Sequence, residues 1–258
     1  MFEKIKCFIL DMDGTIYLGN ELFSFTKDFL KKVEDTGREY YFFTNNSSKS
    51  QQAYIEKLGK LGIQIKKDQM MTSSHVIVKY LKEHYEGKSI YVLGTPSLIQ
   101  EFQYFDMNLT EEDPDIVVLG FDTTLTYKKL SKACHYIRNG CIYFGINPDW
   151  NCPMEGGAFI PDCGSIAKLI EASTGRFPEF FGKPSKHTLD YIIQETGYEP
   201  DEIAIVGDRL YTDIAVADQS DVMSILVLSG ESTREDVKTS DVKPNVILED
   251  LSEITKML

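Results

Sequence analysis

The stretch CFILDMDGT, residues 7–15, is the part of the sequence that decides the fold. Its first four residues are apolar without alternation, and they run directly into two carboxylates and a glycine. A short continuous apolar run of this kind is typical of a strand buried on both faces of a parallel sheet. Ligands of open α/β sheets bind beyond the carboxyl ends of the strands. Residues 7–10 are therefore predicted to be a strand that presents Asp11 and Asp13 at the ligand-binding edge.

The same pattern recurs along the chain. Apolar runs at 40–43, 203–206 and 224–228 each lead into small or polar residues. Between such runs lie segments with a helical pattern, and each ends close to a glycine, as helix C-termini often do. The predicted helices are 26–35, 50–61 and 185–196. Alternation of strand and helix predicts an α/β fold with a doubly wound parallel sheet, that is, a Rossmann-like core.

The middle of the chain predicts a second, inserted unit. It has its own apolar strands, at 90–94, 116–120 and 141–146. Its predicted helices are 97–105, 127–139 and 165–173. Since these segments can build a core of their own, we place an inserted α/β domain at 84–177. The first domain then consists of residues 1–83 and 178–258.

Composition limits the classes of partner. The 258 residues carry 40 Asp and Glu against 27 Lys and Arg, a formal net charge of −13. Such a surface repels phosphate backbones and anionic lipid, so nucleic acid and membranes are not expected as partners. No apolar run approaches the ~20 residues that span a bilayer, and the run at 7–10 is too short for a signal peptide. A homo-oligomer is compatible with the sequence, which does not define the oligomeric state.

The cysteines indicate the compartment. There are five, an odd number, and no two of them form a CxxC pattern. This favours reduced thiols over a disulfide framework or a zinc site. We therefore expect a cytoplasmic protein.

Four predicted strand ends carry reactive side chains. Lys183 follows the short apolar stretch 177–181, which we interpret as one of these strands. If all four strands belong to one parallel sheet, the side chains meet in one crevice. The set is Asp11, Asp13, Thr44, Asn45, Lys183, Asp208 and Asp213.

This set of side chains suits phosphoryl transfer. Carboxylates with a free coordination position bind Mg²⁺, which prefers oxygen ligands. Hydroxyl, backbone N–H and ammonium groups bind the oxygens of a phosphate. A carboxylate beside the metal can attack phosphorus, and a second, protonated carboxyl group can donate to the leaving oxygen. The sequence therefore predicts a Mg²⁺-dependent site for a small phosphorylated metabolite.

These residues also carry a resemblance to a known family. Asp11-Met12-Asp13-Gly14-Thr15 resembles the first motif of the haloacid dehalogenase (HAD) superfamily of phosphohydrolases. The other matching motifs are Thr44-Asn45-Asn46-Ser47, Gly182-Lys183-Pro184, the stretch 207–213, Asn147-Pro148-Asp149, Pro153 and Gly164-Ser165-Ile166. Their order and spacing are similar, over nearly the whole chain, to the NagD-like, 4-nitrophenylphosphatase-like branch. The resemblance implies a phosphatase whose middle segment is a type-C2 cap.

The resemblance implies roles in catalysis and metal binding. Asp11 would be the nucleophile and a Mg²⁺ ligand. Asp13 would be the general acid and base, with its backbone carbonyl on the metal. Asp208 would be the side-chain metal ligand, and Asp213 would support the metal, directly or through water. After Asp213 the chain departs from the small, Gly-containing sequence usual in the family, which affects the local helix end more than the chemistry.

The family resemblance also implies which residues bind the phosphate group. The Thr44 hydroxyl and Asn45 would bind phosphate oxygens. Lys183 would neutralise both the nucleophile and the phosphoryl group.

Other interpretations of the same residues stay open. The acidic pair at 11 and 13 could form an ordinary turn, and Thr44 or Asp213 could cap a helix without binding a ligand. At the level of the whole protein, the alternatives are a receiver-like signalling module and a phosphate-binding protein without catalysis. Receivers are shorter and lack the DxDGT string, and binding alone does not require Asp13.

The stretch 147–153 is a candidate specificity loop. It follows a predicted strand and is bracketed by prolines, so we expect a stiff loop. It contains Trp150, the only tryptophan of the chain, beside Asn151 and Cys152. Trp150 could fill the base of the inserted domain's core, or these three residues could contact the leaving group of the substrate. The substrate itself is not defined by the sequence.

Overall fold

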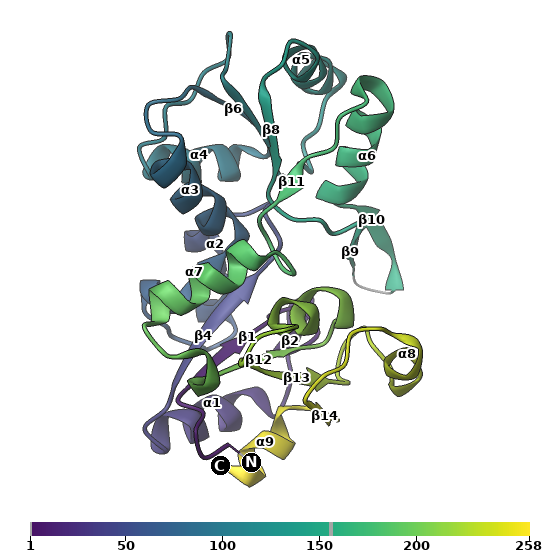
Figure 1. The fold of residues 1–258 in the computed structure, drawn as a ribbon. Helices are drawn as coiled ribbons and strands as arrows, with labels where there is room; N and C mark the ends of the chain where they lie inside the picture. The colour runs from purple at the N-terminus through teal and green to yellow at the C-terminus, as the bar shows by residue number, and fades with distance from the viewer. Residues whose placement is uncertain (1, 155–156) are drawn as a thin grey trace. The chain divides into compact units, whose positions relative to one another are not determined.

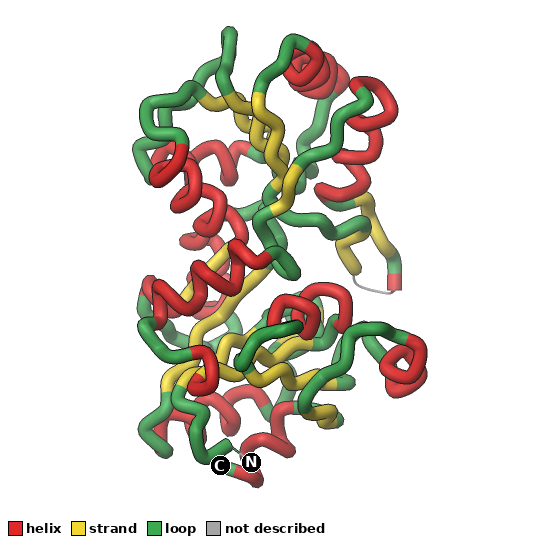
Figure 2. The backbone as a smooth tube through the Cα atoms, in the orientation of Figure 1, coloured by secondary structure: helices red, strands yellow, loops and turns green. Residues whose placement is uncertain are grey.

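The computed structural model describes residues 2–154 and 157–258, which form two compact units (Figures 1 and 2). The first unit comprises the chain up to Thr44, Ile55–Met71 and Lys183–Leu258. The second comprises Asn45–Tyr54 and Thr72–Gly182. Among the described residues, no helix combines the length and the apolar character that crossing a membrane requires.

The first unit is built on a six-stranded sheet with the order β14-β13-β12-β1-β4-β5. The strand β1 lies inside the sheet and pairs in parallel with β12 on one side and β4 on the other. Every residue of β1 and β12 is buried, as expected for strands covered on both faces. The strands are β1 (Cys7–Leu10), β4 (Glu39–Thr44), β5 (Met70–Thr72), β12 (Ile203–Gly207), β13 (Met223–Val227) and β14 (Val246–Leu248).

Helices lie on both faces of this sheet. The helices α1 and α9 pack together on one face, and α7 lies on the other with the turns that follow β12 (Figure 1). Phe29 and Val33 face inward from α1 at helical spacing, and the Phe29 ring meets Phe8 of β1 edge-on. The helices of the unit are α1 (Thr26–Asp35), α7 (Lys186–Thr196), α8 (Arg234–Thr239) and α9 (Leu251–Met257). A small hairpin, β2 (Tyr17–Leu18) and β3 (Glu21–Leu22), follows β1.

The second unit has its own parallel sheet, in the order β11-β8-β7-β6. Its core lies between this sheet and two helices, α5 and α6, which contribute Ile137 and Ile170 to it. The strands are β6 (Ile90–Leu93), β7 (Ile116–Leu119), β8 (Ile142–Gly145) and β11 (Glu179–Phe180). The helices are α3 (Ser73–His84), α4 (Pro96–Tyr104), α5 (Tyr127–Arg138) and α6 (Cys163–Thr174). The helix α2 (Gln51–Lys60) begins in this unit and continues into the first. The predicted α/β fold with a doubly wound core is confirmed.

One predicted strand belongs to a different sheet. The prediction that the stretch before Lys183 lies in the same sheet as β1 is wrong, because β11 pairs with β8 in the second unit. Its aromatic side chains explain this. The Phe180 ring lies over Gly145, where a Cβ atom would come within 2.4 Å of it. The next residue, Phe181, stacks edge-on against Phe144.

The compact units divide the chain differently from the predicted boundaries at 84 and 177. Both α3 and the segment 45–54 lie in the second unit. Tyr80 of α3 packs against Phe144 and Phe181, and the buried Glu101 of α4 accepts from the backbone N–H of Gln51. A helical pattern in the sequence indicates which face of a helix is apolar, but not which of two cores that face packs against. These contacts decide that the second unit includes both segments.

The expected stiff loop at 147–153 is only partly a loop. From Asn151 the chain forms β9 (Asn151–Pro153), which pairs in antiparallel fashion with β10 (Phe159–Pro161). Cys152 and Ile160 lie opposite each other in this hairpin, and both pack on the core of the second unit. The prolines at 153 and 161 are therefore hairpin residues at the edge, where a missing N–H is tolerated.

Candidate active site

Three carboxylates of the first unit meet at the carboxyl ends of adjacent strands. Asp11 follows β1 and Asp208 follows β12, and the last pair of residues in the register of these two strands is Leu10 and Val206. Asp213 lies on the next turn of chain, Leu210–Ile214. One oxygen from each of the three carboxylates lies within 4.8 Å of the others. The parallel register of β1 and β12 thus brings together residues that are about 200 positions apart in the sequence.

Lys183 joins this group from outside the sheet. Its side chain is 3% exposed, and its Nζ lies 2.7 Å from Asp11 Oδ1 and 2.5 Å from Asp213 Oδ1. Nζ also donates to the backbone oxygen of Phe43 at 3.3 Å. Burial alone would lower the pKa of Lys183, but the two carboxylates outweigh it and raise the pKa. The ammonium therefore stays charged and bridges two of the three carboxylates.

Glycines make room for the carboxylates. Gly14 has a φ of +88°, and a Cβ atom there would lie 2.4 Å from Asp208 Oδ2. A Cβ atom at Gly230 would lie 2.0 Å from the same oxygen. Because both backbones approach the carboxylate this closely, only glycine fits at either position, and at Gly14 the left-handed φ adds a second reason.

The cluster holds more negative charge than its lysine neutralises. Burial and then the charge of Asp213 raise the pKa of Asp11 to about 7, against the lowering effect of Lys183 and Arg209. Burial and the charges of Asp11 and Asp213 also raise the pKa of Asp208 well above its usual range. Without a further cation, Asp11 therefore takes up a proton close to neutral pH.

The donor set fits a divalent cation. Asp208 Oδ2 accepts from the backbone N–H of Glu231 at 2.7 Å, whereas its Oδ1 is buried and has no hydrogen-bond partner among the described residues. A buried carboxylate oxygen without a partner is costly unless a cation or a proton occupies it. Carboxylate oxygens are the ligands that Mg²⁺ prefers. Asp11 and Asp208 are thus the side chains that could hold the metal, with Asp213 beside them.

A consequence for stability can be tested on metal-free protein. A carboxyl group whose pKa is higher in the folded chain than in the unfolded chain binds protons preferentially when folded. This proton binding stabilises the folded chain. For Asp11 the stabilisation is fully present below its unfolded pKa, 3.8, and is lost as the pH rises through about 7. Asp208→Asn removes one of the like charges, so the variant should lose less stability over this window. Melting temperatures in EDTA between about pH 5 and pH 8 measure the difference. If the melting temperatures of wild type and Asp208→Asn change with pH in parallel, repulsion among these carboxylates is not the cause.

The remaining predicted residues lie in different surroundings. Thr44 is buried at the end of β4, and Asp13 is half-buried and bridges to Tyr17 beside the small hairpin. Asn45 lies in the second unit, where its Nδ2 donates to Asp149 Oδ2 at 2.9 Å. The structure thus brings Asp11, Asp208, Asp213 and Lys183 together and gives Asn45 a separate buried partner.

Sequence analysis missed the network around Asn45. Asn147 Nδ2 donates to Asp149 Oδ2 at 2.8 Å and to Asp162 Oδ1 at 3.0 Å, and Ser47 Oγ donates to Asn147 Oδ1 at 2.6 Å. All of these residues are at least nine-tenths buried. For Asn147 and Asp149 the signal in the sequence was their position after β8, at the carboxyl end of the second sheet. The network ties the segment after β4 to the start of the candidate specificity loop.

Trp150 does not fill the core of the second unit, so that interpretation is wrong. Its side chain is 48% exposed. Its backbone carbonyl accepts from Ser165 Oγ at 2.6 Å and from the N–H of Asp162 at 2.9 Å. Asn151 is exposed as well, whereas Cys152 is half-buried against the core.

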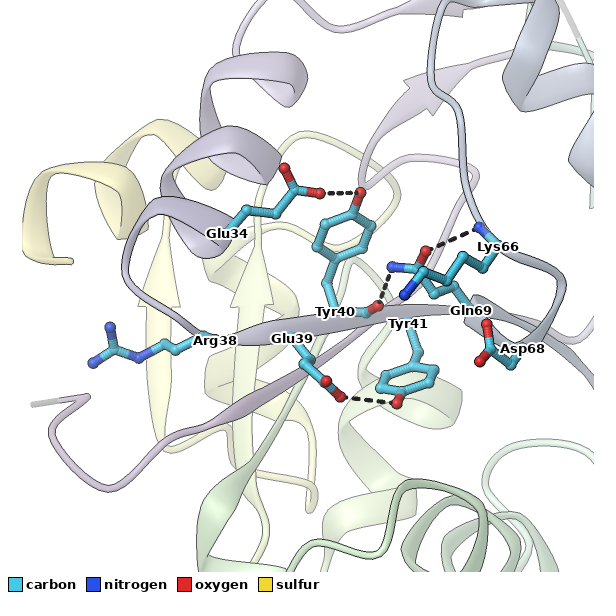
Figure 3. Close-up of a pocket in the computed structure, with 8 residues that line it drawn as sticks. All are labelled: Glu34, Arg38, Glu39, Tyr40, Tyr41, Lys66, Asp68 and Gln69. Atoms are coloured by element: carbon cyan, nitrogen blue, oxygen red, sulfur yellow. Dashed lines mark hydrogen bonds between the residues drawn. The ribbon is translucent and has the colours of Figure 1, made fainter.

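One pocket of the first unit lies away from the carboxylates. It has a volume of about 150 Å³ and surrounds the amino end of β4, the end opposite Thr44 (Figure 3). Its tyrosines are already engaged, since Tyr40 bonds Glu34 at 3.1 Å and Tyr41 bonds Glu39 at 3.0 Å. The position at the amino end of the strands separates this pocket from the candidate active site.

Comparison with known proteins agrees with the site. A family model described as haloacid dehalogenase-like hydrolase matches residues 8–108, and a second HAD-like hydrolase model matches residues 180–254. An acid sugar phosphatase of Staphylococcus aureus is 33% identical over 252 residues, which are 97% of each chain. The chain belongs to the haloacid dehalogenase-like hydrolases.

Solved structures place this hydrolase in the NagD-like branch. The 4-nitrophenylphosphatase of Thermotoga maritima is 42% identical, with a TM-score of 0.95 over 99% of this chain and 98% of that one. NagD from Escherichia coli K-12 is 30% identical, with a TM-score of 0.88 over 96% of this chain and 98% of that one. The similarity first seen in short motifs thus extends over nearly the whole chain. The fold is a Rossmann-like core with a cap.

Proposed function

We propose that this hydrolase is a Mg²⁺-dependent phosphatase of a small phosphorylated metabolite, acting through an aspartyl-phosphate on Asp11. The enzyme class, a phosphatase, follows from the family and from relatives named as phosphatases. The metal and the intermediate rest chiefly on one observation: a buried cluster of three carboxylates and a lysine in which Asp208 Oδ1 has no partner among the described residues. That cluster has the charges that phosphoryl transfer needs, at the ligand-binding edge of the sheet.

In the first step, an oxygen of Asp11 would attack phosphorus while the bond from phosphorus to the leaving oxygen breaks. Bound Mg²⁺ would supply the positive charge that lets an anionic carboxylate approach an anionic phosphate. Lys183, already within hydrogen-bond distance of Asp11, would hold this carboxylate in place and offset charge on the phosphoryl group. Protonated Asp13 would donate its proton to the leaving oxygen.

In the second step, water would attack the phosphorus of the aspartyl-phosphate. Asp13 would take a proton from this water, and the bond between phosphorus and Asp11 would break to release inorganic phosphate. The Thr44 hydroxyl would bind phosphate oxygens throughout. The family resemblance assigns Asn45 to phosphate binding as well, and we keep that role as part of the proposal.

Turnover of 4-nitrophenyl phosphate tests this proposal. We expect phosphate release with Mg²⁺, none after removal of the metal by EDTA, and recovery when Mg²⁺ is added back. Ca²⁺ should not replace Mg²⁺, since it takes more ligands at longer distances and would draw both oxygens of Asp11 away from phosphorus. Activity that is unchanged in EDTA would contradict the metal assignment. Phosphate binding without turnover under any condition would favour a non-catalytic protein instead.

For the substrate class, we propose a small phosphate monoester whose leaving group is recognised by the second unit. Relatives are named as an acid sugar phosphatase and a 4-nitrophenylphosphatase. Sugar phosphates are therefore one class to test, and the family resemblance adds nucleoside monophosphates, phosphoglycolate and pyridoxal phosphate for comparison. A phosphate-release screen over such a panel at equal concentrations would rank them by kcat/KM.

Trp150 should affect this ranking. Its half-exposed ring is free to stack on a leaving group, so Trp150→Ala should raise KM for the best metabolite several-fold and change the order of the panel. Activity on 4-nitrophenyl phosphate, with its small leaving group, should fall much less. The melting temperature should stay nearly constant because little core is lost. Tyr127→Ala, at the exposed start of α5, serves as the control. An unchanged ranking would exclude a role for Trp150 in specificity.

We also propose a cytoplasmic location, with no nucleic-acid or membrane partner. The net charge of −13 and five free cysteines support this view. Fractionation of cells that express the protein would test the location, and a size measurement in solution would determine whether it forms a homo-oligomer.

A further inference from the structure

The loop after β13 wraps around the carboxylate of Asp208. Ser232 N–H donates to the backbone oxygen of Asp208 at 3.1 Å, and Ser232 Oγ accepts from the N–H of Leu210 at 3.2 Å. Ser229 Oγ donates to the backbone oxygen of Gly14 at 2.7 Å. Residues 229–232, called the 229–232 loop below, therefore contact both chain segments that carry the site's carboxylates.

One residue of this loop orients the carboxylate directly. The N–H of Glu231 donates to Asp208 Oδ2 at 2.7 Å. This leaves Oδ1 as the oxygen without a partner among the described residues. The bond thus determines which oxygen of Asp208 is available to a cation, and its effect depends on how firmly Glu231 is held.

The side chain of Glu231 is held at both oxygens, by one ion pair and one hydrogen bond. Oε2 forms an ion pair with Arg209, 2.9 Å from its Nε, and Oε1 accepts a hydrogen bond from the hydroxyl of Tyr211 at 2.9 Å. Arg209 is itself tied to the site, because its N–H donates to Asp213 Oδ2 at 3.0 Å. A continuous chain of contacts therefore runs from Asp213 through Arg209 and Glu231 to Asp208.

We propose that Glu231 is a positioning residue for the metal ligand Asp208. By joining the 229–232 loop to Arg209 and Tyr211, its side chain holds its own N–H against Asp208 Oδ2 and keeps Oδ1 directed toward the cation position. The inference rests on the proposed function of Asp208 in metal binding. It adds a residue that touches neither substrate nor metal and that no motif of the family resemblance includes.

The effect should appear in metal affinity. Partners that orient metal ligands typically contribute about 10-fold or more to affinity. Glu231→Ala removes both anchors, so the Kd for Mg²⁺ should rise about 10-fold, with kcat at saturating Mg²⁺ within about threefold of wild type. Glu231→Gln can still accept from Tyr211, so it should restore a large part of the affinity. Tyr211→Phe removes only one anchor and should cause a smaller loss.

Calorimetric titration of the 258-residue chain with Mg²⁺ measures these constants without substrate. Glu249→Ala is the matched control, since Glu249 is an exposed acid paired with Arg234, and it should bind Mg²⁺ as wild type does. Asp208→Asn is the reference for loss of the site. Should Glu231→Ala fail to fold, Tyr211→Phe tests the same anchor.

The outcomes separate the two proposals. If Asp208→Asn loses Mg²⁺ binding while Glu231→Ala and Tyr211→Phe bind as wild type, the positioning role is overturned and the metal site stands. Equal losses in Glu231→Ala and Glu231→Gln would show that the hydrogen bond from Tyr211, which glutamine can still accept, does not hold the loop, and this overturns positioning through both contacts. If Asp208→Asn binds Mg²⁺ as wild type, the metal site itself is wrong.

Discussion

Asp11→Asn should lower kcat for 4-nitrophenyl phosphate on the order of 10³-fold or more, because an amide cannot act as the attacking nucleophile. The fold should persist. The asparagine is nearly the same size, and its oxygen can still accept from Lys183. Loss of one buried like charge should even favour the metal-free folded state. Phosphate release at saturating substrate and Mg²⁺, with a melting curve of the same sample, measures both effects.

The control for this variant is Asp190→Asn, a change at an exposed position on α7. It should retain wild-type turnover. If Asp11→Asn keeps more than a few per cent of the activity, the covalent mechanism is wrong. Wild-type enzyme quenched in acid during turnover should carry a phosphoryl group that is absent from the variant.

Lys183→Met should have the largest effect on stability. Removing one partner of a buried ion pair leaves uncompensated charge and typically costs about 3 kcal/mol or more. Here two carboxylates, Asp11 and Asp213, would lose their shared cation. The free energy of unfolding of the metal-free protein should therefore fall by about 3 kcal/mol near pH 8, and turnover should be lost as well. Urea denaturation in EDTA measures the change.

The pH dependence identifies the cause of that loss. Protonation of Asp11, whose pKa is about 7 in the intact cluster, removes part of the repulsion, so the deficit of Lys183→Met should shrink toward pH 5. Lys238→Met, at an ion pair exposed on α8, should change stability little at either pH. A deficit that is independent of pH would point to lost packing instead of charge.

The local sequence was sufficient to predict the core strands and the carboxylates at their ends. The run 7–10 is apolar on both faces, so it can only be a buried strand or a buried helix segment, and its length favours the strand. Since parallel strands present their carboxyl ends at one edge, strand-end position alone predicts that Asp11 and Asp208 meet, as they do. The helix predicted at 26–35 has the observed bounds because its apolar spacing and its terminal glycine are both local signals.

Tertiary structure decided how distant segments are shared between the two units. Nothing local tells β11 to pair with β8, yet that pairing takes the strand before Lys183 out of the core sheet. The lysine still reaches Asp11, as a long side chain can cover several ångströms from a loop. Likewise, Asn45 follows a core strand but its amide is bonded to Asp149, more than 100 positions away.

The sequence by itself thus determined the fold class and the acidic residues at the strand ends, because strand periodicity and strand-end position are properties of neighbouring residues. Only the tertiary structure decided that Asp208 Oδ1 is left without a partner among the described residues, that Glu231 contacts Asp208, and that Trp150 is half-exposed. These properties depend on which backbone atoms of remote loops approach one another, and hydrogen bonds and burial across such distances have no local pattern.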